Sequence, residues 1–173
     1  PIREQATILS YRERIIDHLY AAMFNARLNE LSQRADAPFI GAGVDRGIFV
    51  RTKEVAMLSA MAQPDRIGRA LEALVVEASR VERHGFTATE LEREKRNLLR
   101  VYDQALAEND KDESAPLAAE YIRNFLTDES LPGIAWEHQM HVKFLPGITL
   151  AEVNALAKLW NGDNSRVVAV SAP

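Results

Sequence analysis

The sequence predicts an α+β fold in which helices pack on one face of a small, mainly antiparallel sheet. A long stretch with apolar residues at helical spacing opens the chain, glycine-rich and β-branched segments follow it, and two capping boxes start later helices. The chain has 173 residues, 47% of them hydrophobic and 27% charged, which is typical of one ordinary globular domain. No internal repeat or long linker divides it.

The first predicted element is a long helix from about Leu9 to Arg34. Apolar side chains recur there at steps of three and four, the spacing of one buried helical face. They are Ile8, Ile15, Ile16, Leu19, Tyr20, Met23, Leu28 and Leu31. Pro38 then ends the helical geometry, because proline lacks the N–H that a helix interior needs.

Two strands are predicted next. Glycines at positions 41, 43 and 47 predict a bent or bulged strand over residues 39–47, with a turn near Asp45-Arg46-Gly47. A phosphate-binding loop is disfavoured, because such a loop follows a strand and opens a helix. Residues 48–62 alternate as a strand does. One side carries Val55, Met57, Ser59 and Met61, and the other carries Ala56, Leu58 and Ala60. The small residues on the second side would let a helix pack closely.

Pro64 and Asp65 interrupt this run, and Asp65 is expected to cap the next helix, which Gly85 ends. The inward stripe of that helix is predicted to comprise Ile67, Leu71, Leu74, Ala78 and Val81. Thr87 and Glu90 then form a capping box that starts a helix at Ala88, with an apolar staple between Phe86 and Leu91. The predicted buried face is Leu91, Leu98, Leu99, Tyr102 and Leu106. The predicted solvated face is Glu92, Arg93, Glu94, Arg96 and Arg100.

Residues 108–114 are polar enough to form a loop or kink. A further helical stripe follows, made by Leu117, Tyr121, Ile122, Phe125 and Leu126. A shorter helix is predicted from Ala135 to Phe144. A second capping box, Thr149 with Glu152, with Ile148 and Val153 as its staple, starts a last helix that ends at Asn161-Gly162. Residues 166–171 read as a buried strand, so three or four strands are expected, with one sheet edge open.

The four histidines are the first candidates for metal binding. His138 and His141 lie three apart beside Glu137, a spacing that could place two ligands on one helical face. A third ligand is missing, and no carboxylate lies between the two histidines to activate water. We therefore expect an exposed or half-buried helix face, and structural roles for His18 and His84. No catalytic, cofactor-binding or metal-binding residue is assigned, since cysteine is absent and no serine lies in a nucleophile elbow.

Charge and hydropathy argue against two classes of partner. The 21 basic and 25 acidic residues give a net charge of −4, which disfavours nucleic acid as a partner. No stretch approaches the roughly 18 consecutive apolar residues of a membrane-spanning helix, so no membrane partner is expected.

Several segments together resemble the insulinase-type (M16, pitrilysin-like) zinc peptidases. They are YRERIIDHLYAAMFNARLNE at Tyr11–Glu30, the turn Ala37-Pro38-Phe39, and ERHGFTATEL at Glu82–Leu91 with Asn97-Leu98-Leu99 beyond it. The Gly-Phe-Thr-x-x-Glu-Leu string after a helix is frequent in that family. The similarity is greatest to large bacterial members, in the domain that follows the catalytic one, where a terminal Asn-Ala-Leu-Ala segment also occurs.

The resemblance implies homologous α/β domains that enclose unfolded peptides, with zinc held by a His-x-x-Glu-His helix that this chain lacks. Residues 1–173 are then expected to be a single non-catalytic domain of a larger protein, a prospect that Pro1 in place of methionine also favours. Its partners would be the other domains of that larger protein, here called the parent, and a peptide substrate. The bacterial branch of the family suggests that the parent is periplasmic. The alternative is a scaffold module of the same fold, or a stand-alone binding domain unrelated to peptidases.

Two departures from the family pattern bear on the site. Related domains that complete an active site carry an arginine and a tyrosine after the first helix, whereas the matching region here runs from Arg34 to Phe39. The phenyl ring of Phe39 has no hydroxyl to stabilise an oxyanion, so no catalytic residue is carried over. The strands that precede the long helix in the family are also missing. The resemblance therefore implies a truncated sheet whose exposed edge could pair with peptide or with a second copy.

Overall fold

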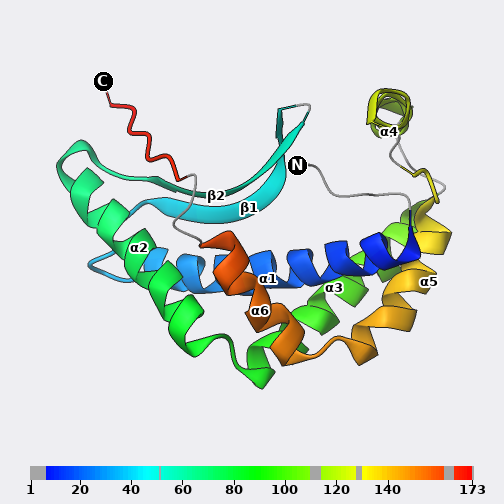
Figure 1. The fold of residues 1–173 in the computed structure, drawn as a ribbon, viewed down its shortest axis with the longest axis horizontal. Coiled ribbons are helices and arrows are strands. Elements are labelled where there is room, and N and C mark those ends of the chain that lie inside the picture. The colour runs from blue at the N-terminus through cyan, green and yellow to red at the C-terminus, as the bar shows by residue number, and fades with distance from the viewer. Residues whose placement is uncertain (1–6, 51, 110–113, 128–129, 162–165, 173) are drawn as a thin grey trace.

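The computed structural model describes residues 7–50, 52–109, 114–127, 130–161 and 166–172. Its helices are α1 (Ile8–Ser32), α2 (Ile67–His84), α3 (Ala88–Glu108), α4 (Ser114–Thr127), α5 (Ile134–Phe144) and α6 (Leu150–Trp160). The strands β1 (Gly41–Val50) and β2 (Lys53–Met61) pair antiparallel, and two short 3₁₀ turns, η1 (Pro64–Arg66) and η3 (Leu145–Gly147), precede α2 and α6. Most helices lie on one side of this sheet (Figure 1), which confirms the predicted α+β class.

Helix α1 is the central packing element. It lies directly under the sheet and contacts β1, α3, α5 and α6 (Figure 1). Its most deeply buried side chains are Leu19, Tyr20, Met23, Phe24 and Leu28. Because these follow the three- and four-residue spacing read from the sequence, the predicted long helix and most of its apolar face are confirmed, whereas Ile8, predicted to lie on that face, is exposed.

The two faces of the sheet also follow the predicted alternation. Val44 is buried, and Leu58, which pairs with it in the register, packs against the same core. Met57 and Met61 project from the other face and are exposed. Asn25 of α1 closes the outer edge of β1 at one point, since its Oδ1 accepts from the Val44 N–H (2.7 Å) and its Nδ2 donates to the Val44 carbonyl (3.0 Å). Neither backbone group of Val44 therefore points to β2.

The predicted turn at Asp45-Arg46-Gly47 is wrong, because β1 continues through these residues to Val50 and pairs with β2 along its length. Glycine permits a turn but does not require one, and Gly47 lies opposite Val55 in regular register. The glycine-rich segment is a strand, as expected, with an irregularity only between Ile48 and Val50.

The predicted buried strand at residues 166–171 is also wrong. Residues 166–172 are exposed, Val167 to 88%, and they form no strand. Their β-branched composition favours a strand only where a neighbouring strand offers hydrogen bonds. In the part of the chain that the structure describes, the sheet has two strands rather than three or four, and no strand pairs with the outer edge of β2.

Several predicted helix faces need correction. Leu71 and Leu106 are exposed, because the face that α2 buries is instead Ala70, Leu74, Glu77 and Val81, and the burial along α3 fades before its last turn. Glu94, predicted to be solvated, is buried and receives hydrogen bonds from Arg93 and Asn97. Asp65 lies in η1 and does not cap α2, whose first turn has no side-chain cap.

The polar segment before α4 is only partly described, since residues 110–113 lie outside the described residues. Helix α4 forms as predicted, but the described members of its apolar stripe face solvent. Among the described residues, no helix is long and apolar enough to cross a membrane.

Both predicted capping boxes are confirmed, at Thr87 with Glu90 and at Thr149 with Glu152. The Glu90 carboxylate accepts from the Thr87 N–H (2.7 Å) and also from Nε and Nη2 of Arg27 on α1 (2.6 and 3.0 Å). Partial burial raises the pKa of Glu90, but the hydrogen bonds from Arg27 and Thr87 outweigh this effect and lower it to about 2.

The turn before α3 is held by side chains from two more distant helices. Arg27 donates from Nη2 to the Gly85 carbonyl (3.1 Å), and its guanidinium lies 4.8 Å from the centre of the Phe86 ring. Asn154 of α6 accepts from the Phe86 N–H through Oδ1 (2.8 Å). Gly85 has a φ of +68°, and a Cβ at this position would lie 2.6 Å from the Asn154 amide nitrogen. Both the backbone conformation and the available space therefore require glycine.

Gly85→Ala is expected to lower the free energy of unfolding by about 1–3 kcal/mol, through the positive φ and the clash with Asn154. The matched control is Gly68→Ala in α2, where a Cβ meets open space. That change should raise stability by up to roughly 1 kcal/mol, because alanine is the better helix former. Urea unfolding measures both variants, and equal effects of the same sign would contradict this account of the turn.

His141 of α5 belongs to a buried aromatic cluster. Its ring stacks on Tyr102 with centroids 3.6 Å apart, and Tyr11 approaches edge-on at 5.8 Å. Nδ1 lies 2.8 Å from the Glu137 carbonyl oxygen, which can only accept, so Nδ1 donates. Burial lowers the pKa of His141, an effect that the Glu137 carbonyl partly opposes. The neutral imidazole is thus the form that the fold accommodates.

The free energy of unfolding should fall as the pH is lowered from about 7 towards 5. Folding lowers the pKa of His141, so over this range the unfolded chain binds a proton at His141 more readily than the folded chain. His141→Phe keeps a ring in the cluster and should flatten this dependence. Urea unfolding at several pH values checks it, and an unchanged slope in the variant would show that His141 is not responsible.

Candidate functional site

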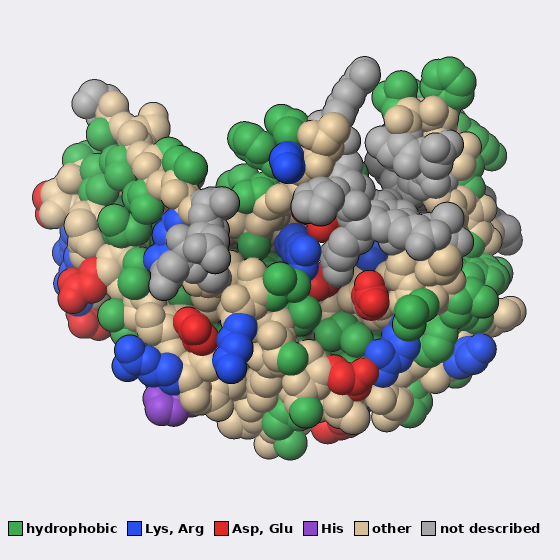
Figure 2. Space-filling model, viewed as in Figure 1, with side chains coloured by type: hydrophobic (Ala, Val, Ile, Leu, Met, Phe, Trp, Pro, Cys, Tyr) green, Lys and Arg blue, Asp and Glu red, His purple; other side chains and the backbone are tan. Residues whose placement is uncertain are grey.

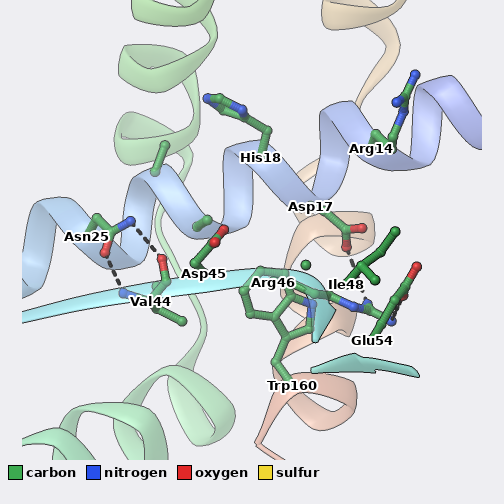
Figure 3. A pocket seen from close by; sticks show the side chains of 13 residues that line it. Arg14, Asp17, His18, Asn25, Val44, Asp45, Arg46, Ile48, Glu54 and Trp160 are labelled. Carbon is green, nitrogen blue, oxygen red and sulfur yellow. Dashed lines mark hydrogen bonds and ion pairs between the residues drawn. The ribbon is translucent and has the colours of Figure 1, made fainter. Parts of the chain in front are cut away.

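A polar cavity of about 510 Å³ lies between α1, the hairpin and the end of α6 (Figure 3). Helix α1 contributes Arg14, Asp17, His18 and Asn25, the strands contribute Asp45, Arg46 and Glu54, and α6 contributes Trp160. The ring of His18 points away from Arg46 in Figure 3. Burial lowers the pKa of His18, and the negative charge of Asp45 opposes this effect.

Arg46 is the central charge of the cavity. Its guanidinium lies 3.6 Å from Asp17 and 3.2 Å from Glu54, and 5.9 Å from the centre of the Trp160 ring. All three charged side chains are largely buried. The two carboxylates compensate the guanidinium, so the cluster links α1 to the hairpin. This arrangement favours a structural joint over acid-base catalysis, which needs a group poised to exchange a proton.

The two histidines considered as metal ligands are engaged elsewhere. Nε2 of His138 lies 2.7 Å from Oδ1 of Asp103 on α3, and His141 is buried against Tyr102. Across the described residues, no group of three or more histidine, aspartate and glutamate side chains could hold a metal ion. The described side chains therefore do not form a zinc site.

The segment from Arg34 to Phe39, which matches the region of the family's active-site arginine and tyrosine, follows α1. Phe39 is buried in the core, and Arg34 is exposed at the surface. The Phe39 ring therefore packs against apolar neighbours and faces no solvent-accessible site. Of the other histidines, His84 is the exposed last residue of α2.

Sequence reasoning missed the Arg46 cluster. One signal was present in the sequence. Arg46 lies two residues after Val44, so the two side chains lie on the same face of the strand. In the structure this face is turned towards α1. The partners of Arg46 could not be found in this way, because Asp17 is nearly thirty positions earlier and belongs to another element. The Asn25 bond to the edge of β1 was missed for the same reason.

The opposite face of the sheet is open. The hairpin carries a shallow groove of about 420 Å³ lined by Ile40, Gly41, Ala42, Gly43, Ser59, Ala60 and Met61, and four of these residues, Gly41, Gly43, Ser59 and Met61, belong to this face in the register. Figure 2 shows the upper surface hollowed between the hairpin tip and the C-terminal segment, residues 166–172. In the part of the chain that the structure describes, α1 packs on one face of the sheet, and the exposed side chains of Met57 and Met61 lie on the other.

No family model matches the chain. It is 25% identical over 154 residues to a zinc protease PQQL-like protein of Arabidopsis thaliana, which covers 89% of this chain and 13% of the relative. The first half of the periplasmic protease PqqL from Escherichia coli has a similar structure, with a TM-score of 0.83, 18% identity, and 92% of this chain and 34% of that chain covered.

A predicted insulinase family protease from Yersinia pestis is also similar in structure, with a TM-score of 0.75, 12% identity, and 94% of this chain and 35% of that chain covered. The chain thus spans about an eighth of the Arabidopsis relative and about a third of each of these two solved chains. In sequence and in fold it resembles one part of larger insulinase-like (M16) zinc peptidases, as the sequence analysis predicted.

Proposed function

We propose that the chain is a non-catalytic domain of a zinc-dependent metalloendopeptidase and forms part of the wall of a peptide-enclosing chamber. The observation that carries this proposal is the one-sided packing of the sheet. Helix α1 covers one face, whereas the other face is open, hollowed and largely apolar. A surface of this kind suits contact with extended, unfolded chains.

The comparisons support a non-catalytic role for this domain beside a separate catalytic domain. The relative is named a zinc protease, and the chain matches only a small part of it. Since the described residues offer no fit for zinc, the metal and the hydrolysis would belong to another domain of the polypeptide. The similar PqqL structures are described as periplasmic, and we propose the same compartment for the parent of this chain.

The chemistry of the open face fits varied peptide sequences. Along β1 the outward positions include three glycines, which allow a peptide backbone to approach closely. Opposite them on β2 stand Val55, Met57, Ser59 and Met61. Met57 and Met61 are 50% and 69% exposed. Methionine is flexible and polarisable, so it adapts to different partners without selecting one side chain.

Met61→Asp in the full-length protein is expected to raise KM for an unfolded peptide by about 3- to 10-fold, because a charge replaces an apolar contact of roughly 1 kcal/mol. The value of kcat, the zinc content and the melting temperature should stay unchanged, since Met61 is exposed and lies outside the core. Steady-state kinetics measures the split between KM and kcat.

The matched control is Val101→Asp, an exposed apolar position on α3. Helix α3 packs on α1 and α5 and has no substantial contact with the described strands. This control should leave KM unchanged. Equal kinetics for Met61→Asp and the unmodified protein would exclude the open face of the sheet as a peptide-contacting wall.

A further inference from the structure

Helix α4 exposes its apolar side. Tyr121, Ile122, Phe125 and Leu126 are 66%, 59%, 86% and 64% exposed, although their spacing is that of a buried helical face. Asn124, a polar residue of the same helix, is only partly exposed and has an interaction partner. The arrangement is the reverse of an ordinary surface helix, in which the apolar stripe faces the core and polar residues face water.

Helix α4 has little packing against the other described elements. Figure 1 shows α4 standing apart from the other helices, and no described element packs substantially against it. Helix α4 has 14 residues, and isolated helices of that length are marginal in water. Helix stability in proteins comes mainly from packing an apolar face, so α4 requires a surface that the described part of this chain does not supply.

Other apolar residues are exposed at the same end of the molecule. The starts of α1 and α5 lie at the end of the long axis where α4 stands (Figure 1). Ile8 and Leu9 at the start of α1 are exposed, and so is Leu131, which precedes α5. We call α4 together with these three residues the α4 end. Apolar exposure of this extent marks an interaction surface rather than scattered surface residues.

We propose that the α4 end docks onto an apolar surface of another domain of the same, longer polypeptide, a proposal that rests on the proposed function. The described side chains of the α4 stripe are uncharged, which is typical of the dry core of a permanent interface. The relatives are three to eight times longer than the matched segment, so a tethered neighbour is available to the parent. Tethering gives such a neighbour an effective concentration in the millimolar range, which a second copy does not match at ordinary protein concentrations.

Amide hydrogen exchange tests the proposal without relying on activity. We compare the 173-residue chain with the full-length gene product and follow the amides of residues 118–126. In the full-length protein these amides should exchange at least about 100-fold more slowly, because docking suppresses local opening. The amides of α2, at the opposite end of the molecule, should exchange alike in both and serve as the internal reference.

Phe125→Asp in the full-length protein should return the α4 amides to fast exchange, while Val75→Asp, an exposed position on α2, should leave them protected. Equal exchange of α4 in the two proteins would overturn the proposal. Protection in the 173-residue chain that grows with its concentration would also overturn it and assign the surface to a second copy. Slow α4 exchange in a full-length protein that binds no zinc would uphold the docking and reject the peptidase assignment alone.

Discussion

The ion pair between Arg27 and Glu90 is the contact on which the rest of the structure depends. It ties the C-terminal part of α1 to the first turn of α3 with two hydrogen bonds, and Arg27 also donates to the Gly85 carbonyl at the end of α2. Both side chains are mostly buried, so this bidentate pair is stronger than an exposed ion pair. Because Glu90 also completes the capping box, one carboxylate starts α3 and fixes its position on α1.

Once α1 is fixed, it positions the sheet. Asn25 holds the edge of β1 at Val44, and the buried charges of Asp17, Arg46 and Glu54 link the same helix to both strands. These contacts commit one face of the sheet to α1 and leave the other face open. The proposed function follows from this asymmetry, since a rigid sheet with one free, methionine-bearing face can serve as a wall for peptides of varied sequence.

Much of the fold could be predicted because its signals are local. The capping boxes at Thr87 and Thr149, the long spacing pattern of α1 and the alternation along β2 each involve residues only a few positions apart. The Arg46 cluster could not be predicted, because its members come from elements distant in the sequence. The exposure of α4 and of residues 166–172 was missed for a different reason. Apolar periodicity and β-branched composition report that a segment needs a partner, but not whether the partner lies in the same chain.

The most direct test of the account is zinc content and peptide hydrolysis, measured in parallel on the 173-residue chain and on the full-length gene product, both prepared with zinc present. We expect the full-length protein to bind zinc and cleave unfolded peptides, and this chain to do neither, because His138 pairs with Asp103 and His141 packs on Tyr102. One zinc per molecule in this chain alone would contradict the account. A full-length protein without zinc or hydrolysis would instead favour a scaffold module.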